Sequence, residues 1–87
     1  MNWQNHKGSA IWLLMAQGAC LHNHMDKAQT MFKKAVEFSP TNYDLNVRLA
    51  EFLKDRYEAS GDQRLREEGL QYFERAIKYA PTAGKIR

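Results

Sequence analysis

The sequence predicts an all-α fold made of two helix–turn–helix units, and three observations lead to this prediction. Residues 31–40 (MFKKAVEFSP) and 72–81 (YFERAIKYAP) align without a gap, which indicates that one structural unit occurs twice. Upstream of each copy, apolar residues recur at spacings of three and four, which places them on one helical face. Each copy ends in a proline, Pro40 or Pro81, whose missing N–H ends a helix. Four helices in two antiparallel pairs are therefore expected.

The first unit is expected to hold helices over about 9–22 and 26–38, preceded by a loose segment, 1–8. Ser9 is a suitable N-cap for the first of these helices. The apolar positions of that helix are Trp12, Met15, Ala16 and Ala19. Asn23 tolerates the left-handed backbone conformation, so it suits the turn between the two helices.

The second unit is expected to hold helices over about 43–59 and 62–79, followed by a loose tail, 82–87. Asn42 is a suitable N-cap for the first helix, and the sequence Ser60-Gly61-Asp62 is typical of a turn. The apolar positions of the 43–59 helix are Leu45, Leu49, Ala50, Phe52 and Leu53.

Small and aromatic residues recur at matching positions in the second helix of each unit. Ala28 matches Gly69, and both are small enough to let a neighbouring helix approach closely. Phe32 matches Phe73, and each ring is expected to fill the space between helices, where full burial contributes roughly 1.5–3 kcal/mol. The remaining matched pairs are Ala35 with Ala76 and Pro40 with Pro81.

This pattern resembles the tetratricopeptide repeat. The resemblance covers residues 9–81, and its signature positions are Trp12, Ala28, Phe32, Ala35, Pro40, Gly69, Phe73, Ala76 and Pro81. Repeat one, 9–42, has the 34 residues typical of the family, whereas repeat two, 43–81, is longer by seven residues between prolines. Asn46 also stands where the family pattern has an aromatic residue. The resemblance implies two stacked antiparallel helix–turn–helix repeats that form a short right-handed α-solenoid.

The longer second repeat is also similar to the half-a-TPR repeats of RNA-processing scaffolds. The segments that carry this second resemblance are Ala50-Glu51-Phe52 and Phe73-Glu74-Arg75-Ala76. The tryptophan and tyrosine that this family has in its first helix are missing here, so a scaffold in RNA processing is the alternative. The extra residues, within 54–68, are strongly charged and indicate either a solvated tip or a partner-specific projection.

The tetratricopeptide resemblance implies a protein–protein interaction module, either an adaptor or a scaffold. In that family the first helix of each repeat lines a concave groove that holds a peptide or helix of a partner protein. The matching groove positions here are Leu13, Gln17, Cys20, Leu21, Val47, Arg48, Glu51 and Lys54. Packing of Leu13 and Leu21 against the N-terminal segment, under Trp3, is the competing interpretation. Leu13, Gln17 and Arg48 differ from the carboxylate clamp of chaperone-binding repeats, so that ligand class is not expected.

The last helix carries more apolar residues than one neighbour can cover. They are Leu65, Leu70, Tyr72, Ile77 and Tyr79. Three interpretations remain open: a homo-oligomer contact, permanent packing in a larger complex as a structural subunit or assembly factor, or a fragment of a longer repeat protein.

Composition narrows the classes of partner and location. The formal net charge is only +3 and no basic block stands out, so nucleic acid is not expected as a partner. The single cysteine favours an intracellular, cytoplasmic setting over a disulfide framework. The longest apolar run, 11–16, is far shorter than a membrane span, so a soluble chain is expected.

Catalysis and cofactors are not expected. Cys20, His22 and His24 form a C-x-H-x-H string, but on a helix His22 points away from the face that Cys20 and His24 share. A Cys–His nucleophile pair would need an orienting residue, and none can be named. No metal ligand set or phosphate-binding loop is therefore assigned.

Overall fold

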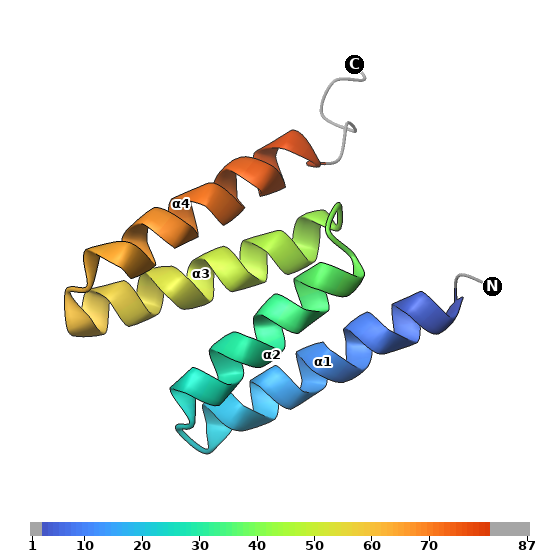
Figure 1. Ribbon diagram of the computed structural model, residues 1–87, viewed down its shortest axis with the longest axis horizontal. Coiled ribbons are helices and arrows are strands. Elements are labelled where there is room, and N and C mark those ends of the chain that lie inside the picture. The colour runs from blue at the N-terminus through green and yellow to red at the C-terminus, as the bar shows by residue number, and fades with distance from the viewer. Residues whose placement is uncertain (1–2, 81–87) are drawn as a thin grey trace.

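The computed structural model describes residues 3–80 and is all-helical over that range (Figure 1). The helices are α1 (Trp3–Leu21), α2 (Met25–Phe38), α3 (Tyr43–Ser60) and α4 (Gln63–Lys78). They lie side by side in chain order, so α1 packs against α2, α3 packs against α4, and the contact between α2 and α3 joins the two pairs. The expected all-α fold class is thereby confirmed.

The helix boundaries agree with the sequence except at the first helix. Helices α2, α3 and α4 begin and end within one residue of the expected positions. Helix α1 begins at Trp3, six residues earlier than expected, so residues 3–8 are helical rather than loose and Ser9 is not an N-cap. No proline stands in this stretch to stop the helix. Ser9 is instead buried within α1, where its Oγ shares a hydrogen bond with Ser39 Oγ. Pro81 and the expected loose tail, 82–87, lie outside the described residues.

The predicted turn and cap residues have the expected geometry. Asn23 and Gly61 have φ values of 63° and 77°, in the left-handed region. The Oδ1 atom of Asn42 accepts a hydrogen bond from the Leu45 N–H at 3.0 Å, which caps α3. Asp62 caps α4 in the same way, because its Oδ1 accepts from the Arg64 N–H at 3.0 Å. Local chemistry therefore sets where these helices start and stop.

The hydrophobic core is built on three helices, and Leu65 and Tyr72 of α4 pack against it. Its buried residues come from α1, α2 and α3: Ala16, Phe32, Ala35, Val36, Leu45, Leu49 and Leu53. The rings of Phe32 and Phe52 lie 5.0 Å apart between centroids and are tilted by 43°, a favourable arrangement for two aromatic rings. Ala28 and Ala35 are fully buried, as their small size predicts. The predicted aromatic position of the first unit thus lies in the core.

Phe73, the residue that matches Phe32, lies in different surroundings. Its ring is only half-buried and lines an open hollow between α3 and α4, although Gly69 and Ala76 on the same helix are buried. The expectation of two equivalent buried rings is therefore wrong for Phe73. The reason is that Phe32 is covered by Phe52 from the following helix, and within residues 3–80 no helix follows α4.

Asn46, which stands where the tetratricopeptide resemblance predicts an aromatic residue, makes buried hydrogen bonds in the structure. Its side chain is completely buried, and its Nδ2 group donates to the carbonyl oxygens of Asn42 at 2.8 Å and Pro40 at 3.1 Å. These bonds hold the link between α2 and α3 against the start of α3. A hydrogen-bonding side chain at this position therefore fixes the connection between the two helix pairs.

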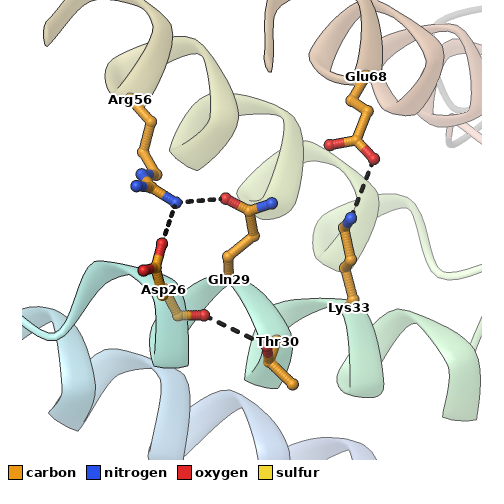
Figure 2. Close-up of polar contacts among 6 residues, drawn as sticks. All are labelled: Asp26, Gln29, Thr30, Lys33, Arg56 and Glu68. Carbon is orange, nitrogen blue, oxygen red and sulfur yellow. Dashed lines mark hydrogen bonds and ion pairs between the residues drawn. The ribbon is translucent and has the colours of Figure 1, made fainter. Parts of the chain in front are cut away.

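Two charged side chains of the second helix pair, one from α3 and one from α4, also bind partners on α2 and so connect the pairs (Figure 2). Lys33 of α2 contacts Glu68 of α4 at 2.9 Å. Arg56 of α3 donates to Gln29 Oε1 at 2.7 Å and contacts Asp26 at 3.2 Å, both on α2. Arg56 and Glu68 belong to the charged 54–68 stretch. This stretch is therefore not wholly a solvated tip, because two of its charges bind α2.

Candidate protein-binding groove

Two hollows lie along the seam between the first helix pair and α3. The first hollow is close to the α2–α3 link and is lined by Ser9, Ala10, Leu13, Ser39, Asn42, Asp44 and Leu45. Leu13 is half-buried and packs against the core cluster, and with Ala10 it makes the α1 wall mostly apolar, next to the hydroxyl of Ser9. Asp44 on the opposite wall is exposed and pairs with Arg48 at 3.2 Å, one helical turn further along α3. This hollow therefore has one apolar wall and one charged wall.

The second hollow lies where α1 ends and α2 begins. Its lining residues are Cys20, Met25, Phe52, Asp55, Arg56, Ala59 and Ser60. Cys20, Met25 and Phe52 provide a mostly apolar floor, while Asp55 and Arg56 provide charges from α3. Arg56 is already bound to Asp26 and Gln29, whereas Asp55 takes part in no ion pair with the residues described. A carboxylate is therefore free beside an apolar depression.

The predicted groove residues do not all lie in one place. Leu13 and Cys20 lie at the first and second hollow, respectively. Gln17 and Val47 are half-buried, whereas Arg48 and Glu51 are exposed on α3. Leu21 is 87% exposed at the end of α1 and lines neither hollow. Lys54 lies elsewhere, at the hollow between α3 and α4, and contacts Glu58 at 3.1 Å.

Phe52 and Asp55 line the second hollow, and sequence reasoning did not include them among the predicted groove residues. Residues 48, 52 and 55 are spaced by four and three, so they share one helical face. The predicted groove position Arg48 therefore pointed to Phe52 and Asp55 as well. The ring of Phe52 packs on Phe32 in the core and also lines the second hollow. Spacing alone does not show that one side of the Phe52 ring belongs to the core while the other side lines a surface hollow.

The chemistry of Cys20 follows from its position. Burial raises the pKa of the Cys20 thiol above its ordinary value, so the thiol remains protonated at neutral pH. His22 and His24 are exposed, and their ring centroids lie 6.4 Å apart. Among the side chains that the structure describes, those of residues 8–80, no group of three His, Cys, Asp or Glu is placed to hold a metal ion. Cys20 contributes a small apolar surface to the groove.

Over the same described range, none of the helices combines the length and the apolar character that crossing a membrane requires. Comparison with known protein families, with curated proteins and with solved structures gives no match to this chain.

Proposed function

We propose that the chain is a protein-binding module of two tetratricopeptide-type repeats, stacked as a short right-handed α-solenoid, that holds a peptide or helix of a partner protein. The observation that carries this proposal is the pair of hollows along the seam between the first helix pair and α3. Each hollow combines apolar side chains with a carboxylate of α3, which is Asp44 in the first hollow and Asp55 in the second. The internal sequence repeat and the order of helix contacts support the repeat assignment.

The two walls define the kind of segment that would bind. An apolar side chain would occupy the depression formed by Cys20, Met25 and Phe52, where it loses contact with water. A basic side chain next to it would meet the free carboxylate of Asp55. An amphipathic segment with a basic flank has both features, and such segments commonly dock in helical grooves.

The first experiment is a selection of peptides from a random library against the full chain, followed by titration of an enriched peptide. We expect enrichment of amphipathic sequences that carry a basic residue. Leu13→Glu should raise the Kd of the selected peptide by about tenfold or more, because it places a charge on the apolar wall; a tenfold change corresponds to about 1.4 kcal/mol. Asp55→Lys should weaken basic peptides selectively.

Leu14→Glu is the matched control for Leu13→Glu. Leu14 is the next residue on the same helix, is largely exposed and lines neither hollow. It should leave the Kd unchanged. Failure to enrich any peptide, or equal loss of affinity in the Leu13 and Leu14 variants, would contradict the groove assignment.

A structural subunit of a larger assembly is the second candidate function. It is favoured by the large apolar side chains that remain exposed on the outer helices, among them Leu14 on α1 and Ile77 on α4. In that case the isolated chain should associate or lose stability when purified, which sedimentation and thermal unfolding measure.

A further inference from the structure

We infer that two copies of this chain associate head to tail, with α1 of one copy on α4 of the other, in the way that α3 packs on α2 within one copy. The inference does not depend on the groove, because it concerns the two outer helices of the array. It follows from comparing each residue of the α2–α3 contact with the residue that matches it in the other repeat.

The surface of α2 that receives α3 has a counterpart on α4. On α2, Phe32 packs on Phe52 of α3, and Val36, which is 3% exposed, belongs to the same core cluster as Leu45 and Leu49 of α3. Addition of 41 to each number gives Phe73 and Ile77 on α4. Phe73 is half-buried and Ile77 is 75% exposed. The receiving surface is therefore present on α4, with similar side chains, but uncovered by any residue described.

The surface of α3 that docks on the first helix pair has a counterpart on α1. On α3, Leu45 and Leu49 are buried against the first pair, and Leu49 is fully buried. Subtraction of 34 gives Ile11 and Met15 on α1, which are 53% and 46% exposed. Helix α1 thus presents the docking surface of α3, again uncovered. A helix with apolar side chains on several faces is normally buried on more than one side.

The two uncovered surfaces also compensate each other in volume. Gly18 of α1 stands where α3 has Phe52, and a side chain added at Gly18 would meet no atom within 4 Å. Helix α1 therefore lacks one ring of the docking surface. On α4, the exposed Leu70 stands where α2 has the polar Gln29, next to the open hollow at Phe73. The apolar volume missing on α1 is thus supplied by α4.

Charge complementarity selects a second copy as the occupant. Within one chain, Lys33 of α2 contacts Glu68 of α4. The residue that matches Lys33 on the receiving side is Glu74, and the residue that matches Glu68 on the docking side is Lys27. Both are exposed. A head-to-tail contact would therefore place Glu74 of one copy opposite Lys27 of the next, with the signs exchanged but still opposite.

The contact joins two different surfaces, so it leaves one of each free and can repeat into a ring or an open chain. Sedimentation equilibrium of the full chain should therefore give a weight-average mass that rises with concentration above the monomer mass of 10.1 kDa. Met15→Glu and Ile77→Glu should each shift the chain to monomer, because a single substitution destroys one of the two surfaces in every copy.

Mixing the two variants is the decisive measurement. Met15→Glu retains a normal α4 surface and Ile77→Glu retains a normal α1 surface, so the mixture should form a one-to-one dimer and stop there. Leu14→Arg is the control on α1, because Leu14 matches Arg48 of α3, which is exposed and lines neither hollow at the first pair. Leu14→Arg should leave the association unchanged. Glu74→Lys should weaken association, and addition of Lys27→Glu should restore it.

A wild-type chain that stays monomeric, or a mixture that stays monomeric while each variant is folded by circular dichroism, overturns the inference. Loss of association in only one of the two variants also overturns it, because that result would show contact between two copies of the same helix. The variant Leu13→Glu should associate normally, so failure of the groove proposal and failure of this one are distinguishable.

Discussion

At the scale of single residues, equal positions in the two units have unequal surroundings. Phe32 packs on Phe52 and is buried, whereas Phe73 has no such cover among the described residues and borders an open hollow. The energetic contribution of a ring depends on how much contact with water it loses on folding. The two phenylalanines should therefore differ in what they contribute to stability, despite their matching sequence contexts.

Truncation of each ring tests this difference. Phe32→Ala should lower the free energy of unfolding by about 3–5 kcal/mol, the usual cost of removing a buried phenylalanine side chain. Phe73→Ala should cost about half as much, since its ring is already partly in contact with water. Urea unfolding at low protein concentration, followed by circular dichroism, measures both values. Equal losses for the two variants would contradict the assigned burial.

At the scale of the elements, Gly61 and Gly69 differ in whether the backbone and packing require glycine. Gly61 ends α3 with a positive φ of 77°, which side-chain-bearing residues adopt with strain. Gly69 lies inside α4, where a Cβ atom would be 3.5 Å from both Ala50 O and Leu53 Cβ. That distance is ordinary van der Waals contact. Its matching residue on α2 is Ala28, which is fully buried without steric conflict.

Alanine at these two positions should act in opposite directions. Gly61→Ala should destabilise the fold by about 1 kcal/mol, because it forces a side chain into the left-handed conformation. Gly69→Ala should stabilise it by about 0.5–1 kcal/mol, because alanine has less backbone entropy to lose in a helix. Thermal unfolding of the two variants beside the wild type gives the signs. A destabilised Gly69→Ala would show that α3 and α4 approach more closely than described.

At the scale of the whole molecule, one continuous core and several polar contacts join the helix pairs. The core includes residues of α1, α2 and α3, and Lys33 and Arg56 connect α2 to α4 and α3. The ion pairs are partly exposed, so each contributes about 1 kcal/mol or less. Cooperative unfolding of the two helix pairs therefore depends mainly on the apolar contact between them. Asn46 adds hydrogen bonds that hold the link between α2 and α3.

Unfolding should therefore occur as a single transition. Both tryptophans, Trp3 and Trp12, belong to α1, so their fluorescence reports on the first pair, whereas far-ultraviolet circular dichroism reports on all helices. The two signals should have the same urea midpoint, as two-state unfolding requires. Lys33→Met should lower that midpoint slightly in both signals together. A fluorescence midpoint clearly below that of circular dichroism would mean that the pairs unfold separately.

The sequence by itself determined the all-α class, the extents of α2, α3 and α4, and the turn and cap residues Asn23, Asn42 and Gly61. These features depend on spacing, capping and backbone preference, which act within a few residues along the chain. It also identified Leu13 and Cys20, which the structure brings to the two hollows.

Only the tertiary structure decided the burial of Phe73, the buried role of Asn46, and the presence of Phe52 and Asp55 at the second hollow. It also separated Lys54 from the other predicted groove residues. Each of these features depends on which helix covers a given face, and that helix is distant in sequence. Matching residues in two similar sequence segments share their local preferences, but their burial depends on the helix that each segment meets.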